Sequence, residues 1–211
     1  MHILVFGDSI TQGAFDAECG GWVNRLEAYC FDSAIKNDFQ DKPLVFNLGI
    51  SGDRALRVRA RLESELQARR DSDGLMLVIF AVGINDSMVK IETGENDTPI
   101  GVYEKALQEM VDIVRPLGCQ TLFVGLTPIE QAKLDPIPWN KEFAYRTDEI
   151  MKFDIVMAKV AIDNKIGFIS MQNVFGVDPQ ICLSDALHPN ATGHRLMFLR
   201  VKDYLEKEKI I

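Results

Sequence analysis

The sequence predicts an α/β fold, a single three-layer α/β/α domain whose sheet has five mostly parallel strands. Short, continuously apolar runs recur along the chain, which is typical of strands buried on both faces. Longer segments with helical spacing of apolar residues separate these runs, as in βαβ units. A length of 211 residues suits one domain, so we expect a single domain over residues 1–211.

The apolar runs place the strands. The first run reads His-Ile-Leu-Val-Phe-Gly and ends in glycine, and the second repeats this form. The third precedes Gly83, the fourth precedes Thr127, and a weaker fifth run lies nearer the C-terminus. The predicted strands cover 2–7, 44–49, 75–82, 121–126 and 166–170.

Apolar residues spaced three or four apart place the helices between these strands, as with Trp22, Leu26 and Tyr29 in the first. The predicted helices cover 21–36, 54–69, 100–117, 141–164 and 191–208. Two connections that follow strands, 86–99 and 127–140, are unusually long. Ligands bind outside the carboxyl ends of strands in open α/β sheets, so we expect these loops to rim the functional site.

The composition argues against some classes of binding partner and indicates a cellular compartment. The formal net charge of −8 argues against non-specific binding to nucleic acid or to anionic membranes. The four cysteines lie far apart without a C-x-x-C pair, which favours reduced thiols in an intracellular protein. The sequence has no run of eighteen apolar residues and no recognisable signal peptide, so we expect a cytoplasmic protein.

Several familiar site motifs are absent from the sequence. The first strand is not followed by G-x-G-x-x-G, and no G-x-x-x-x-G-K-[ST] loop occurs, which disfavours dinucleotide or P-loop binding. The G-x-S-x-G elbow of α/β-hydrolases is missing as well. His188, His194 and Cys182 have no recognisable metal-ligand spacing. We therefore expect no metal and no cofactor.

Short polar clusters follow the strands instead. They are Gly7-Asp8-Ser9-Ile10-Thr11, Gly49-Ile50-Ser51-Gly52-Asp53, Gly83-Ile84-Asn85-Asp86 and, near the C-terminus, Asp185-Ala186-Leu187-His188-Pro189-Asn190. Each cluster alone is also compatible with a turn, a helix cap or a surface pair. Their joint occurrence, in this order, favours a site to which all four contribute.

Together the four clusters resemble the blocks of the SGNH, or GDSL-like, family of esterases and lipases, from Gly7 to Pro189. Ile10 stands where the family name carries leucine, a conservative change. The resemblance implies a flavodoxin-like SGNH hydrolase fold, with Ser9 as nucleophile, His188 as base and acid, and Asp185 as its orienting partner. It further implies an oxyanion hole formed by Ser9, Gly52 and Asn85.

The residues themselves support a similar interpretation. A serine needs a base to become a nucleophile at neutral pH, and the chain has three histidines. His2 lies in the first strand and is expected to be structural, and His194 is expected on a helix surface. His188 is then the candidate base, with Asp185 near enough in sequence to fix its tautomer.

Further candidates for substrate contact each have a structural alternative. These candidates are Asp8, Arg54, Asp86, Met88, Trp139 and Tyr145. The two aspartates are expected to organise the turn at Ser9 and to brace the loop after Asn85. Arg54, with Arg57 and Arg61, is also compatible with a solvated basic helix face. Trp139 and Tyr145 suit either an acyl or sugar pocket or the cover of the long helix, and Met88 shares that ambiguity.

The favoured hypothesis is a serine hydrolase that cleaves small carboxylic esters through an acyl-enzyme intermediate. The expected partner is a small-molecule ester, with a preference for short acyl chains because the sequence has no evident long apolar groove. The alternative hypothesis is a non-catalytic doubly wound domain that binds a small polar ligand or a protein, since fold alone does not fix function.

Overall fold

A computed structural model describes residues 1–40, 42–70 and 74–211, and it confirms the predicted α/β class. Its main sheet has five strands in the order β2-β1-β3-β5-β7, and every neighbouring pair is parallel. These strands are β1 (His2–Gly7), β2 (Leu44–Gly49), β3 (Met76–Ala81), β5 (Gln120–Val124) and β7 (Gly167–Ile169). Counting only these strands, the order is 2-1-3-4-5, that of flavodoxin-like folds.

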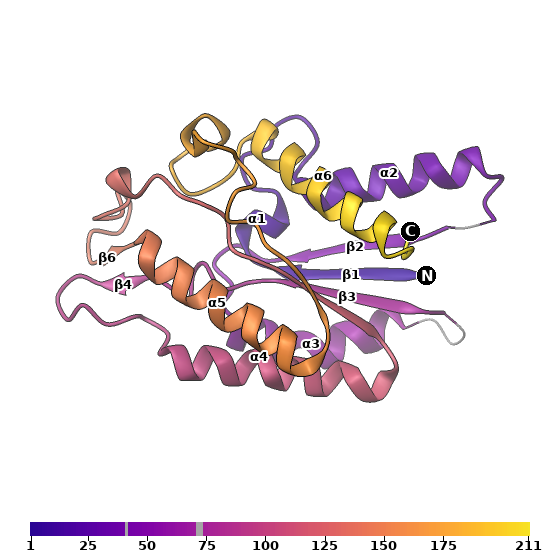
Figure 1. Cartoon of the computed structure of the whole chain (residues 1–211), viewed down its shortest axis with the longest axis horizontal. Coiled ribbons are helices and arrows are strands. Elements are labelled where there is room, and N and C mark those ends of the chain that lie inside the picture. Colours follow the sequence, from indigo (N-terminus) through magenta and orange to yellow (C-terminus); the bar gives the residue numbers. More distant parts are fainter. Residues whose placement is uncertain (41, 71–73) are drawn as a thin grey trace.

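Helices cover both faces of this sheet (Figure 1). On one face lie α1 (Ser9–Gln12), α2 (Trp22–Lys36) and α6 (Ala191–Lys207). On the other lie α3 (Ala55–Arg69), α4 (Ile100–Val114) and α5 (Thr147–Asn164), and α4 contacts both of its neighbours. The final turn of the helix predicted over 100–117 is a separate 3-10 turn, Arg115–Leu117, at Pro116, which has no N–H to donate.

The predicted helix over 141–164 is wrong at its start. Helix α5 begins at Thr147, and the preceding residues form β6 (Phe143–Ala144), which pairs antiparallel with β4 (Val89–Lys90). The 86–99 connection is thus joined by backbone hydrogen bonds to the residues that follow the 127–140 connection. Phe143 and Ala144 continue an apolar spacing that also suits a helix, and only the tertiary pairing excludes it.

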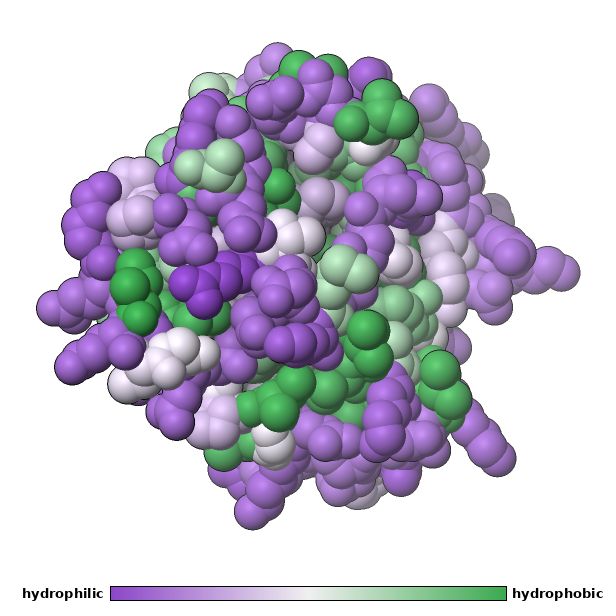
Figure 2. All heavy atoms as spheres, turned by 60° about the vertical axis from the view of Figure 1, so that its left-hand side comes forward, coloured by the Kyte–Doolittle hydropathy of each residue, from purple (hydrophilic) through white to green (hydrophobic). Residues whose placement is uncertain are grey.

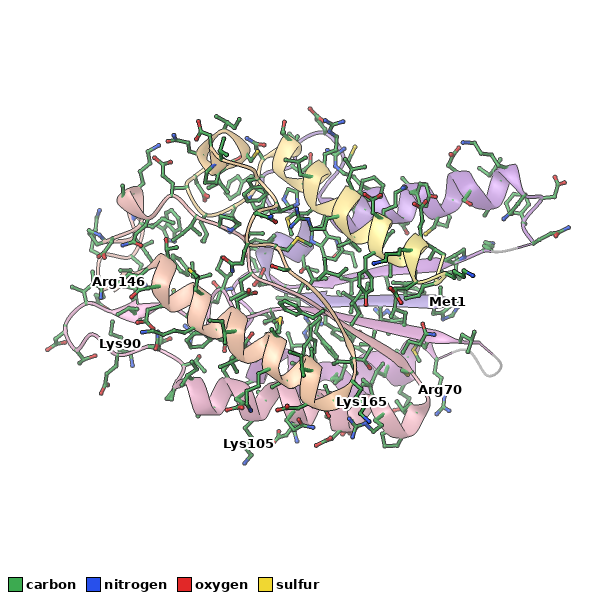
Figure 3. The ribbon with its side chains drawn as sticks, in the orientation of Figure 1. Met1, Arg70, Lys90, Lys105, Arg146 and Lys165 are labelled. Atoms are coloured by element: carbon green, nitrogen blue, oxygen red, sulfur yellow. The ribbon has the colours of Figure 1, made fainter. Side chains whose placement is uncertain are left out.

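The carboxyl ends of the strands and the loops of the candidate site lie at one end of the molecule. In Figure 3, Lys90 and Arg146 lie at this end beside β4 and β6, and Met1 lies at the opposite end. The core beneath the site contains a row of fully buried rings, in which Phe80 of β3 packs on both Phe6 and Phe123 with ring centroids 5.7 and 5.8 Å apart. Across the described ranges, no helix combines the length and apolarity needed to cross a membrane.

Gly13 ends α1 at a turn near the site where the neighbouring backbone leaves no room for a side chain. Its φ is +96°, and a Cβ at this position would overlap the backbone carbonyl of Gly20. Gly94 also has a left-handed φ, +72°, but a Cβ there would meet open space. The two glycines therefore form a matched pair that separates backbone strain from steric overlap.

We predict that Gly13→Ala lowers the free energy of unfolding by about 2–5 kcal/mol, since a left-handed alanine costs about 1–2 kcal/mol and overpacking against the backbone about 1–3 kcal/mol. Gly94→Ala should lower the free energy of unfolding only by the cost of a left-handed alanine, about 1–2 kcal/mol. Urea denaturation of both variants measures the difference. Equal destabilisation would show that the contact between Gly13 and Gly20 is unimportant.

Candidate active site

Ser9 begins α1 directly after β1, and the local sequence fixes that turn. Asp8 is the N-cap of the helix and accepts a hydrogen bond of 3.0 Å from the Ile10 N–H. An N-cap carboxylate satisfies helix donors that otherwise have no partner. This is the turn-organising role expected for Asp8, and it holds the Ser9 side chain at the carboxyl end of the sheet.

His188 and Asp185 approach Ser9 from the loop before α6. The Oγ of Ser9 lies 2.8 Å from Nε2 of His188, and Nδ1 of His188 lies 2.8 Å from Oδ2 of Asp185. The other carboxylate oxygen of Asp185 accepts from the backbone N–H groups of Leu187 and His188. Burial works against ionisation of Asp185, but these hydrogen bonds from His188 and Leu187 outweigh it and lower its pKa. Asp185 is therefore a carboxylate at neutral pH.

Asn85 lies in the same region with its amide locked on both sides. Its Nδ2 donates to the Asp53 carbonyl at 3.0 Å, and its Oδ1 accepts from the Tyr145 hydroxyl at 2.9 Å. Burial raises the pKa of Tyr145, so this hydroxyl keeps its proton and remains a donor. An amide nitrogen carries two N–H groups, so Asn85 retains one donor for a further acceptor.

Gly52 occupies the turn after β2 with φ of +78°. A Cβ there would meet open space, so backbone conformation rather than close approach explains the glycine. Among the hydrogen bonds between described residues, the N–H groups of Ser9 and Gly52 have no acceptor. Both remain able to donate to a ligand.

Two buried carboxyls lie beneath the site. Burial raises the pKa of Asp8 to about 7, against the opposing effects of the Ile10 N–H and of His188. Burial likewise raises the pKa of Asp86 to about 6, against the hydrogen bond from the Ala55 N–H at the start of α3. Asp86 thus braces the loop after Asn85 against α3, as expected, and neither aspartate lines the open pocket described below.

The chain matches a family model described as the GDSL-like lipase/acylhydrolase family over residues 5–196. The chain belongs to this family. The chain is therefore a carboxylic ester hydrolase, and its four polar clusters all lie within the matched range.

The relatives named here share about a fifth to a quarter of their residues with this GDSL-like chain. It is 26% identical over 217 residues to the isoamyl acetate-hydrolyzing esterase 1 homolog of Mus musculus, covering 98% of this chain and 82% of the relative. It resembles the acetyl xylan esterase AlAXEase with a TM-score of 0.73 and 21% identity, covering 97% of this chain and 100% of that one. A variant of the acetyl-xylooligosaccharide esterase Axe2 of Geobacillus gives a TM-score of 0.72 at 21% identity, with 97% and 92% covered. The structural likenesses show a shared fold.

An open pocket of about 520 Å³ lies beside His188. Three candidates for substrate contact remain to be placed relative to it: Trp139, Tyr145 and Met88. Trp139 lines this pocket, which is the first of the two roles considered for it from the sequence. Tyr145 does not line it, because the tyrosine is buried and faces Asn85. Met88 packs against the core as its structural alternative proposed, and is absent from the pocket lining.

The expectation of a solvated basic face holds for Arg57 and is wrong for Arg61. Arg61 is mostly buried and binds both the Asp53 carboxylate and the Leu48 carbonyl, so it fixes the turn that contains Gly52. Arg54 forms an ion pair with Asp97 of the 86–99 connection. Lys90 pairs with the same carboxylate, and Arg54 does not line the pocket beside His188.

His194 is not on a helix surface, contrary to expectation. It is fully buried, and its Nε2 lies 3.2 Å from the Ala14 carbonyl, to which it donates. Burial lowers its pKa, so the ring is neutral. His2, by contrast, binds the Arg69 carbonyl and is structural, as predicted. Within the described part of the chain, no three His, Cys, Asp or Glu side chains are grouped as metal ligands.

Sequence reasoning missed Phe15. Its ring centroid lies 5.1 Å from that of His188, and 60% of the residue is exposed. A large aromatic residue six positions after the serine, in a loop with Gly13 and Gly20, was the available signal. Gln12, which also lines the pocket, had no distinguishing signal in the sequence, whereas Ser51 belongs to the second polar cluster.

The raised pKa of Asp8 makes stability depend on pH. Between its ordinary value of 3.8 and about 7, the folded protein binds more protons at Asp8 than the unfolded chain does. The contribution of Asp8 to stability is therefore complete below pH 3.8 and is lost as the pH rises through 7, by up to about 1.4 kcal/mol per pH unit.

We predict that Asp8→Asn removes this loss while keeping an oxygen for the Ile10 N–H. The free energy of unfolding of the variant, relative to the native protein, should rise between pH 4.5 and 7 in urea titrations. Asp32→Asn, on the exposed face of α2, serves as the control. Parallel pH profiles for the native protein and Asp8→Asn would contradict a neutral, buried Asp8.

Proposed function

We propose that the protein hydrolyses small carboxylic esters with Ser9 as nucleophile, His188 as general base and acid, and Asp185 as the group that orients His188. The observation that carries this proposal is the pair of 2.8 Å contacts that link Ser9 Oγ, the His188 ring and Asp185. This is the geometry in which an imidazole removes a hydroxyl proton while a carboxylate stabilises the resulting imidazolium.

In the first half of the reaction, Ser9 Oγ forms a bond with the ester carbonyl carbon and its proton passes to Nε2 of His188. Collapse of the tetrahedral intermediate breaks the bond to the alcohol oxygen, which takes that proton from His188. In the second half, His188 removes a proton from water, the hydroxide attacks the acyl-enzyme, and the proton returns to Ser9 as the acid leaves.

The oxyanion of each tetrahedral intermediate would bind the Ser9 and Gly52 backbone N–H groups and the free N–H of Asn85. Support comes from the two N–H groups without acceptors and from the Asn85 amide fixed between Asp53 and Tyr145. Donors that need no reorganisation stabilise the developing charge most effectively, each by on the order of 10²–10³ in turnover.

A short acyl group suits this arrangement, because Asn85, which would contact the oxyanion, is buried together with its partner Tyr145. The name of the mouse relative, an isoamyl acetate-hydrolyzing esterase homolog, also favours acetate esters. Arg54 and Lys90 share the Asp97 carboxylate, and neither cation lines the pocket beside His188, which favours an uncharged substrate.

We predict that Ser9→Ala reduces hydrolysis of p-nitrophenyl acetate by at least about 10³-fold, because no group replaces the nucleophile. The variant should also lose labelling by a fluorophosphonate probe while keeping its thermal midpoint. Ser64→Ala, on the outer face of α3, is the matched control and should retain both. Undiminished activity of Ser9→Ala would refute the assignment and leave the non-catalytic binding domain as the better hypothesis.

We predict that Tyr145→Phe lowers kcat about tenfold or more with little change in KM, because Asn85 loses the hydroxyl that fixes its amide. Tyr29→Phe, whose hydroxyl contacts Glu206 on the remote face, should leave both constants unchanged. A rise in KM at constant kcat would instead place Tyr145 in ground-state binding. Equal thermal midpoints would separate this effect from loss of folding.

A further inference from the structure

The pocket beside His188 has two exposed aromatic walls. Phe15 and Trp139 are 60% and 56% exposed, although both residue types are usually well covered in folded proteins. The lining is completed by Gln12, Gly13, Ala14, Ser51, Asp185 and His188. Figure 2 shows that hydrophobic residues are exposed among hydrophilic ones on the face turned forward in that view. Exposed aromatic rings inside a concavity are typical of ligand-binding surfaces.

Phe15 is held in this position by its neighbours rather than by burial of its own ring. Its φ of +65° is a conformation that bulky residues rarely adopt. The preceding Ala14 donates to the Ser9 carbonyl and accepts from the buried His194. The following Asp16 has a buried carboxylate that binds Arg25. Such imposed strain is concentrated at ligand-binding sites.

The carboxylate of Asp16 is fixed by more than this ion pair. Three backbone N–H groups, those of Glu18, Cys19 and Gly21, donate to it. These hydrogen bonds, with the charge of Arg25, lower the pKa of Asp16 despite the opposing effect of burial. The segment that presents Phe15 is therefore anchored on both sides of the aromatic residue.

Trp139 is presented in a comparable way from the 127–140 connection. It lies in a tight turn in which Ile137 and Asn140 pair as an isolated bridge, and the Ile137 N–H donates to the Phe143 carbonyl at 2.9 Å. Ile137 and Leu134 are buried and anchor this turn to the core. Both aromatic side chains are thus held by rigid backbone on opposite segments of the chain.

Proton transfer decides which part of an ester occupies this pocket. If His188 is the general acid, its Nε2 must reach the alcohol oxygen as the bond to carbon breaks. The alcohol portion therefore leaves the reacting carbon on the His188 side, where the Phe15 ring packs. The oxyanion would instead face the Gly52 N–H and the Asn85 amide.

We propose that Phe15 and Trp139 form the subsite for the alcohol portion of the substrate and select esters of apolar alcohols, branched alkyl or aromatic. This inference rests on the proposed function and names its substrate class. Two ring faces and the Ala14 methyl group supply the apolar contact, and the pocket volume of about 520 Å³ accommodates an alcohol of this size.

The test compares acetates that share one acyl group: ethyl, 3-methylbutyl and benzyl acetate, together with an acetylated monosaccharide. The native protein should have the highest kcat/KM for benzyl or 3-methylbutyl acetate. In Phe15→Asn and Trp139→Ala, the ratio of kcat/KM for benzyl acetate to that for ethyl acetate should fall about tenfold, as expected when a hydrophobic pocket loses one wall. Asparagine tolerates the left-handed backbone at position 15, which protects the fold.

Phe39→Asn is the matched control. Phe39 is also exposed, by 61%, and left-handed, with φ of +59°, but it does not line the pocket. This variant should keep the native ratio. Fluorophosphonate labelling of all three variants checks that Ser9 remains reactive, so a failure of the subsite is distinguished from a failure of the proposed nucleophile. An unchanged ratio in Phe15→Asn and Trp139→Ala, or a preference for the acetylated sugar, would overturn the proposal.

Discussion

The 2.8 Å contact between Ser9 Oγ and His188 Nε2 joins residues 179 positions apart, and the rest of the arrangement serves to maintain it. Ser9 follows β1 near the centre of the sheet, and His188 precedes α6, which packs beside α2 on the same face. A contact of this kind requires the carboxyl ends of the parallel strands to meet at one edge. Displacement of either β1 or α6 would separate a proposed nucleophile from its base.

The buried carboxyls of Asp8 and Asp86, below this contact, help to fix the helices that follow the carboxyl ends of the strands. Asp8 caps α1 and Asp86 binds the first N–H of α3, so each carboxyl secures a helix that follows a strand end. Burial raises the pKa of both, which means that each is more easily kept neutral than an exposed aspartate. Helix capping offsets part of the cost of burying them. Each buried carboxyl is therefore retained at the point where a helix start has to be fixed.

Much of this arrangement could be predicted from the sequence, because it depends on local patterns. All five strands of the main sheet are identifiable from continuous apolar runs, and Ser9, Asp185 and His188 occupy short clusters that the structure brings together. The errors have a common cause. The start of α5 depends on the β4–β6 pairing, and the burial of His194 depends on a carbonyl 180 positions away.

Phe15 shows the same limit most clearly, since its significance comes from a left-handed backbone and a neighbouring ring that no sequence pattern encodes.

Charge pairing around the site bears on the class of substrate. Arg54 and Arg61 follow Gly52 in sequence, and a substrate anion would be their natural partner if they were free. Each instead binds an aspartate, Asp97 and Asp53, so that these cations hold the loop after β2 and the 86–99 connection in place. A net charge of −8 further disfavours approach of an anion. An uncharged ester whose apolar alcohol lies between Phe15 and Trp139 satisfies both the electrostatics and the shape of the pocket.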